Sequence, residues 1–117
     1  RLVGIDSLSF KDRLTLEAAR SIREDFLHQN AFHETDTYTS LEKQYRMLNA
    51  ILQFYDKGLT ALDNDVSFSK LSSLPVREDI GRLKYVPESE MEARYKEVIA
   101  RLDDEVRALI EGGNEDA

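Results

Sequence analysis

The chain has 117 residues, no cysteine and a formal net charge of −7 at pH 7. A length of this order is typical of one domain with a core of its own, and the lack of cysteine excludes disulfides, thiolate metal sites and cysteine nucleophiles. The acidic balance disfavours binding to nucleic acid, which depends on lysine and arginine neutralising phosphates, and docking on an anionic membrane surface; basic protein partners stay possible.

Apolar runs are only a few residues long, far below the ~20 residues that span a bilayer. Because the sequence begins at Arg1 rather than at a methionine, we expect it to be a piece of a larger polypeptide. Two prolines, five glycines and 33% charged residues are typical of long solvated helices rather than a sheet.

The first predicted helix runs from Ser9 to Leu27. Ser9 can cap it, with Asp12 as the return partner of a capping box. An apolar stripe recurs at helical spacing along this segment, formed by Leu14, Ala18, Ile22 and Phe26. The polar segment QNAFHETDTY, from Gln29 to Tyr38, then leads to the next helix.

The second predicted helix begins at Thr39, with Glu42 completing a T-x-x-E capping box. Gly58 inside it costs ~1 kcal/mol relative to alanine and marks either a bend or a close helix contact. The polar residues 63–65 end the helix. Its predicted core stripe consists of Leu41, Tyr45, Leu48, Leu52, Tyr55, Leu59 and Leu62.

Residues 67–87 predict two short helices, SFSKLSSL, which Pro75 stops, and VREDIGRLKY, which ends before Pro87. The final helix is predicted to begin at Ser89, with Glu92 as its box partner, and to close at Gly112. Its apolar stripe comprises Met91, Tyr95, Val98, Leu102, Val106 and Leu109. The pattern therefore predicts an all-α fold, a bundle of three main helices plus short helices, as a single domain over residues 1–117 with residues 112–117 as a flexible acidic tail.

The histidines and acids around QNAFHETDTY invite a metal or catalytic interpretation. Zinc-binding histidines on a helix stand four residues apart, whereas His28 and His33 are five apart at a helix end. No G-x-S-x-G motif supports a nucleophilic serine. We therefore expect no metal site and no catalytic residue in this chain, and expect His33, Glu34 and Asp36 to hold the shape of the turn.

No phosphate-binding loop of either common kind occurs, so the chain does not bind a nucleotide through a phosphate loop of its own. Phe32 remains ambiguous at this level. A loop phenylalanine can fill a gap between helices, or it can offer a flat ring on which a base stacks.

Three stretches together resemble the C-terminal helical domain of the catalytic A subunit of A-type/V-type ATP synthases, in the archaeal and bacterial branch. They are VGIDSL, the long run that contains REDFLHQNAFHETDTY and SLEKQYRML, and LPVREDIGRLKY. The resemblance covers essentially the whole chain. It implies a parent subunit that synthesises or hydrolyses ATP, with Mg²⁺, and couples this to H⁺ or Na⁺ transport.

The resemblance also implies the setting of the domain. The parent subunit alternates with B subunits in a hexamer around central stalk subunits, in the peripheral, cytoplasmic sector of a membrane-bound complex. The phosphate loop and the catalytic groups lie in other domains, so ATP or ADP is not expected to bind tightly to this chain alone. The domain would swing as a rigid body about a junction near residues 1–5, and residues 1–8 would form the junction and stalk-facing loop.

By the same resemblance, Phe32 forms one wall of the adenine pocket. Gln29, Asn30 and Ala31 shape the approach to it.

The segment from Asp6 to Asp12 resembles an acidic loop that bears on the rotating shaft in related F-type subunits. Asp6, Leu8, Ser9 and Asp12 keep that pattern, whereas Ser7, Phe10 and Lys11 replace acidic positions. This departure favours a steric or apolar stalk contact through Leu8 and Phe10 over an electrostatic one. Packing of Phe10 as a hydrophobic staple stays open, and the region from Ser67 to Lys84 is a second stalk-contact candidate.

Two other function classes stay open on the residues alone. One is a stand-alone structural or protein-interaction bundle without nucleotide function. The other is a small enzyme built around His33.

Overall fold

A computed structural model describes residues 9–27 and 40–112 of the chain. All regular structure in these two ranges is helical, which confirms the all-α prediction. The elements in chain order are α1 (Phe10–Ser21), the π-helical η2 (Ile22–Leu27), α3 (Leu41–Asp63), α4 (Phe68–Ser72), α5 (Val76–Gly81), the 3₁₀ helix η3 (Leu83–Tyr85) and α6 (Glu88–Gly112).

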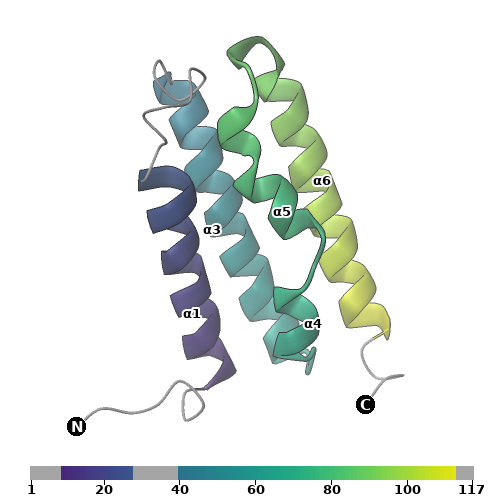
Figure 1. Cartoon of the computed structure of the whole chain (residues 1–117). Coiled ribbons are helices and arrows are strands. Elements are labelled where there is room, and N and C mark those ends of the chain that lie inside the picture. The colour runs from purple at the N-terminus through teal and green to yellow at the C-terminus, as the bar shows by residue number, and fades with distance from the viewer. Residues whose placement is uncertain (1–8, 28–39, 113–117) are drawn as a thin grey trace, which may run out of the picture.

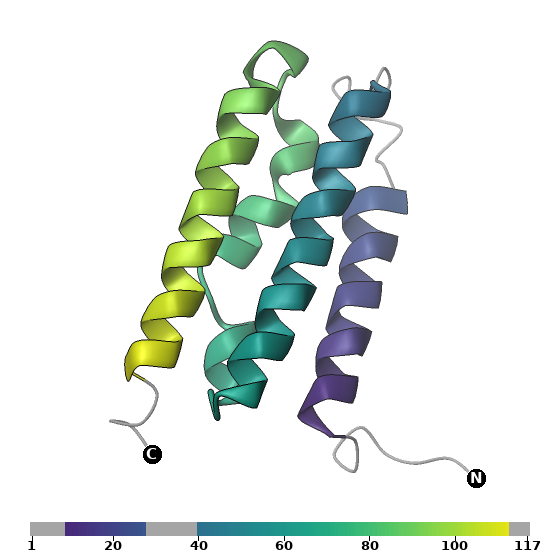
Figure 2. The same cartoon turned by 180° about the vertical axis from the view of Figure 1, so that it is seen from behind.

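The three long helices lie side by side in one layer, with α3 between α1 and α6 (Figure 1). The short helices α4 and α5 cover one face of this layer, and seen from behind the opposite face of α3 has no described helix over it (Figure 2). The chain runs along α1 in one direction and returns along α3, so the start of α1 and the end of α3 lie at the same end of the bundle. We call this the α1 end, and the opposite end, where α3 and α6 both begin, the α3 end.

Core packing explains the unusual glycine in α3. The helix is continuous through Gly58, which is buried, so the glycine marks a close contact rather than a bend. A Cβ added there would lie 2.7 Å from Leu14 Cδ2 and 3.2 Å from Leu71 Cδ2. The missing side chain thus lets α1 and α4 approach the same turn of α3.

The predicted core stripe of α3 is wrong at Leu41, Tyr45 and Leu52, whereas Tyr55, Leu59 and Leu62 pack against the core. The side chains of Leu41, Tyr45 and Leu52 are 82%, 66% and 45% exposed, and the other four members are only half-buried. The fully buried residues lie on an adjoining side of the helix, where small residues let neighbouring helices come close. The buried residues of α3 are Lys43, Met47, Ala50, Ile51, Phe54, Gly58 and Ala61.

Two predicted helix starts are also off by one residue. Ser40, rather than Thr39, is the N-cap of α3, and its side chain accepts a hydrogen bond from the Lys43 backbone N–H. Helix α6 begins at Glu88 rather than at Ser89, and the Glu92 carboxylate pairs with Lys96 at 3.1 Å instead of closing a box. The reason for both shifts is a contact between the two helix starts, described below.

Two further predicted helices are divided: the first ends as an α-helix at Ser21 and continues as the π-helical η2, and VREDIGRLKY forms α5 and η3. Other element predictions hold. Ser9 caps α1 through the Asp12 backbone N–H at 3.1 Å, and Pro75 separates α4 from α5. In α6 the predicted stripe faces the core: four of its members are buried and the other two are half-buried. The buried four are Met91, Val98, Leu102 and Val106.

Candidate functional site

Several residues named above lie outside the described residues. They are Asp6, Leu8, Gln29, Asn30, Ala31 and Phe32, together with His28, His33, Glu34 and Asp36. What the structure describes is the helical frame at both ends of residues 28–39, which follow η2 and precede Ser40, and the start of α1 after residues 1–8. The candidate site therefore consists of the described helix ends next to residues 28–39 and next to residues 1–8.

At the α3 end, the N-terminus of α3 is tied to the N-terminus of α6. Glu88 accepts the Ser40 backbone N–H on Oε1 at 2.9 Å and the Ser40 hydroxyl on Oε2 at 2.8 Å. The Ser40 oxygen in turn accepts the Lys43 backbone N–H at 2.9 Å. These hydrogen bonds, chiefly that of the backbone N–H, lower the pKa of Glu88 below its ordinary value. One serine thus caps its own helix and fixes the neighbouring one.

Lys43 adds a second tie at the same end. Its side chain is only 1% exposed, and its Nζ donates to the carbonyl oxygens of Lys84, at 3.0 Å, and Val86, at 2.7 Å. A buried ammonium group is tolerated only where acceptors replace its water, and these two carbonyls provide them. The first turn of α3 therefore holds the chain segment that leads from η3 into α6. The burial of Lys43 was not predicted from the sequence, where the one signal is a lysine in helical register with Met47, Ala50 and Phe54.

At the α1 end, Phe10 lies in an aromatic cluster rather than alone. Its ring stacks on the ring of Phe68 in α4, with centroids 6.1 Å apart and planes 6° apart, and the Arg13 guanidinium lies 5.3 Å from the Phe68 centroid. Phe10 is still 56% exposed. Phe10 and the region from Ser67 were separate candidates for the stalk contact, and the fold brings them together in one surface. We call Phe10, Arg13 and Phe68 the aromatic end cluster.

Ser9, Lys11 and Asp12 have defined local roles at the same end. Ser9 and Asp12 form the cap of α1. The Lys11 ammonium, which stands at a position that is acidic in the F-type pattern, lies 2.6 Å from the Asp63 carboxylate at the last residue of α3. An exposed pair of this kind contributes little energy, but it adds a contact between the start of α1 and the end of α3.

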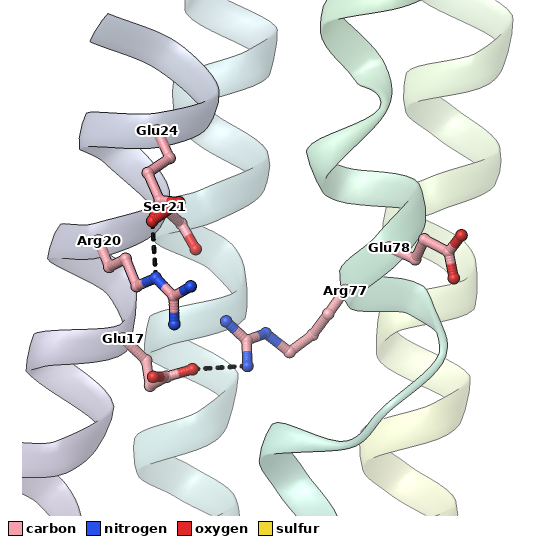
Figure 3. Close-up of a pocket in the computed structure, with 6 residues that line it drawn as sticks. All are labelled: Glu17, Arg20, Ser21, Glu24, Arg77 and Glu78. Atoms are coloured by element: carbon pink, nitrogen blue, oxygen red, sulfur yellow. Dashed lines mark hydrogen bonds and ion pairs between the residues drawn. The ribbon is translucent and has the colours of Figure 1, made fainter. Parts of the chain in front are cut away.

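A polar cleft of about 300 Å³ lies between α1 and α5. Figure 3 shows Arg77 reaching from α5 toward Glu17 on α1, with Glu78 pointing away from that pair. The Arg77–Glu17 distance is 2.8 Å, and the Arg77 guanidinium also lies over the Phe54 ring at 5.1 Å. Arg20 donates to Glu24 at 2.6 Å and lowers the pKa of that carboxyl. Apart from Glu78, the charged side chains of the cleft are thus paired with one another, and the Arg77–Glu17 ion pair connects α5 to α1.

Within residues 9–27 and 40–112, no group of three or more histidine, aspartate or glutamate side chains is arranged to hold a metal ion. Over the same ranges, every helix is too short or too polar to cross a membrane.

The contacts at the two ends of the bundle define a class of protein. It is a helical module with a capped, hydrogen-bonded α3 end and an exposed aromatic α1 end. The sequence-family model described as the C-terminal domain of V and A type ATP synthase matches residues 1–72. With the relatives described next, this match shows that the chain belongs to that family.

The relatives agree across the chain. It is 61% identical over 110 residues, 94% of its length, to the V-type ATP synthase alpha chain of Acetivibrio thermocellus. It is 57% identical over all 117 residues to that of Thermoanaerobacter pseudethanolicus, and 54% identical over 110 residues, again 94% of its length, to that of Clostridioides difficile. The matched region is 19%, 20% and 19% of these three proteins, so the chain spans about a fifth of the length of the curated relatives it matches.

Proposed function

We propose that this chain is the C-terminal domain of the catalytic A subunit of a rotary A/V-type ATP synthase. In this role the domain closes one wall of the adenine pocket and transmits nucleotide-dependent motion to the central stalk. The parent subunit binds Mg²⁺ with ATP or ADP, assembles with B subunits and stalk subunits, and couples ATP synthesis or hydrolysis to H⁺ or Na⁺ transport in the peripheral, cytoplasmic sector of a membrane-bound complex. The observation that carries the proposal is 54–61% identity, over 94–100% of the chain, to proteins named V-type ATP synthase alpha chain.

The architecture supports a mechanical role. Helix α3 has 23 residues, about 34 Å at ~1.5 Å per residue, and links the α3 end to the α1 end without a break. Residues 28–39 are followed directly by the Ser40 cap, and the aromatic end cluster lies at the other end of the bundle. Because the long helices share one packed core, a displacement at one end moves the other as a rigid body.

The pocket wall is assigned to Phe32, with Gln29, Asn30 and Ala31 around it. A phenyl ring that stacks on adenine contributes to binding of the base and does not contact the phosphates. Such a contact stabilises the ground state and the transition state alike, so it changes affinity more than the chemical step.

The test is Phe32→Ala in the full subunit assembled with its complex. We expect the ATP dissociation constant to rise by about ten-fold, as the loss of one base–aromatic stack implies, while the maximal hydrolysis rate at saturating ATP stays within about two-fold. Phe10→Ala is the matched control, because it removes a phenylalanine at the α1 end and leaves nucleotide affinity unchanged. An ATP dissociation constant that Phe32→Ala does not alter would overturn the pocket assignment.

A further inference from the structure

Residues 84–88, which lead from η3 into α6, contact the chain on both sides of residues 28–39. We call them the 84–88 segment, and Figure 1 shows it at the α3 end of the bundle, between α5 and α6. Before residues 28–39, the Lys84 ammonium donates to the carbonyl oxygen of Glu24 in η2 at 3.4 Å. After them, the Glu88 carboxylate accepts the two hydrogen bonds from Ser40. One short segment therefore connects the end of η2 to the start of α3.

The charges of Lys84 and Glu88 suit the helix ends that they contact. Carbonyl oxygens at a helix C-terminus carry partial negative charge, and N–H groups at a helix N-terminus carry partial positive charge. The helix η2, which contains Glu24, has no basic residue in its own last turn, and Lys84 supplies a cation there. Glu88 supplies an anion at the N-terminus of α3. Both contacts are thus electrostatically favourable, and each depends on the sign of its side chain.

Lys43 fixes the backbone of the 84–88 segment. Its buried ammonium donates to the carbonyl oxygens of Lys84 and Val86, at 3.0 and 2.7 Å. Lys43 lies in the first turn of α3, three residues after Ser40, so this backbone is attached to the same helix turn that Glu88 contacts. Buried charged groups are screened by salt much less than exposed ones. The positions of Lys84 and Glu88 relative to α3 are therefore set by a buried contact.

The contacts of Lys84 and Glu88 themselves are at solvent-exposed positions, so they add little to the stability of the core. What they fix is the position of the end of η2 relative to the start of α3. Holding both ends of a segment limits the conformations that it can adopt, and this lowers the entropic cost of ordering it when a ligand binds. Residues 28–39 are the segment whose ends are held in this way.

We propose that Lys84 and Glu88 are positioning residues for the adenine wall. By fixing the end of η2 and the start of α3, they set the placement of Phe32 and hence the affinity for the base. This inference rests on the proposed function, in which Phe32 stacks on adenine. Both residues act through residues 28–39 and contact neither the base nor the phosphates. Their effect is therefore confined to the part of nucleotide binding that the base provides.

Two ligands that differ by the nucleoside test the proposal in the assembled complex. ATP carries adenine, whereas inorganic tripolyphosphate carries the phosphates alone. We expect Glu88→Ala and Lys84→Met each to raise the ATP dissociation constant about five-fold, the size of one net hydrogen bond, and to leave the tripolyphosphate dissociation constant unchanged. Lys84→Arg keeps a cationic donor and should keep the parent affinity for ATP. Glu90→Ala is the matched control, because it removes an exposed carboxylate from the first turn of α6 and leaves both constants unchanged.

A Phe32→Ala background shows whether the two residues act through the adenine wall. If they do, Glu88→Ala causes no further loss of ATP affinity in that background. Three outcomes would overturn the inference while the adenine wall stands: an ATP dissociation constant that neither variant changes, an equal loss for ATP and tripolyphosphate, and an undiminished further loss in the Phe32→Ala background. Failure of the proposed function is distinguishable, because Phe32→Ala alone would then leave ATP affinity unchanged.

Discussion

Glu88 binds Ser40 through both carboxylate oxygens, across 48 positions of sequence, and so joins the first residue of α6 to the N-cap of α3. Because Ser40 also caps its own helix, two helix starts depend on one serine. This contact stands directly after residues 28–39, which include the segment assigned to the adenine pocket.

Ser40→Ala should therefore destabilise the chain by about 1–2 kcal/mol, from the lost cap and the lost hydroxyl hydrogen bond to Glu88, while the backbone N–H of residue 40 still donates to Glu88. Urea denaturation of the single variants Ser40→Ala and Glu88→Gln and of the double variant measures the coupling between them. We expect the double variant to lose less than the sum of the two single losses. Strict additivity would show that the hydrogen bond from the Ser40 hydroxyl to Glu88 contributes nothing to stability.

The same contact predicts a pH dependence. Hydrogen bonding to Ser40 lowers the folded-state pKa of Glu88 below its ordinary value of 4.5. A carboxyl whose pKa is lower in the folded than in the unfolded chain adds stability above the unfolded value, and this stability is lost as pH falls through the folded value. Unfolding free energies at pH 7 and pH 3 should thus differ less in Glu88→Gln than in the parent chain. An undiminished difference would mean that Glu88 titrates alike in both states.

Removing the buried charge of Lys43 should lower the stability of the fold. Lys43→Met keeps the length of the side chain but leaves the Lys84 and Val86 carbonyls without their donor, at a cost of about 1–3 kcal/mol. Lys96→Met removes an exposed lysine from a helical pair with Glu92 and should cost less than about 0.5 kcal/mol. Thermal denaturation compares the two. Equal losses would contradict a structural role for the buried ammonium.

Replacing Gly58 by alanine has two opposing effects on stability: steric crowding in the core and a higher helix propensity. Alanine gains ~1 kcal/mol in helix propensity, yet its Cβ would meet Leu14 and Leu71 inside a closed core, and overpacking of this kind costs about 1–3 kcal/mol. We expect Gly58→Ala to be destabilising by about 1 kcal/mol in denaturant titrations. Gly112→Ala is the control, because a Cβ there meets no described atom within 4 Å. A stabilised Gly58→Ala variant would show that α1 and α4 can move apart freely.

The spacing of apolar residues predicts the buried face of α6 better than that of α3. The apolar residues of α6 form one stripe, so their spacing predicts the buried face correctly. Helix α3 is apolar on two sides, and periodicity alone favours the side with large leucines and tyrosines, whereas packing selects the side with Ala50, Gly58 and Ala61. The spacing of apolar residues along one helix does not predict how closely its neighbouring helices approach it.

The two ends of the bundle show a second limit. The Ser9 cap is a contact over three residues and was predictable from the sequence. The Phe10–Phe68 stack, the Ser40–Glu88 contact and the burial of Lys43 each join residues more than forty positions apart, so they appear only once the helices are packed. Phe32 was assigned by family resemblance, and it stays a prediction because residues 28–39 lie outside the described ranges.

The aromatic end cluster gives the most direct test of force transmission through the bundle. Phe10→Ala with Phe68→Ala removes two stacked rings from the surface assigned to the stalk contact, while the pocket assigned to Phe32 is untouched. The measurement is the number of ions transported per ATP hydrolysed by the reconstituted complex, together with its ATP dissociation constant. We predict a reduced ion-to-ATP ratio with an unchanged ATP dissociation constant. An unchanged ratio would contradict transmission through this end of the domain.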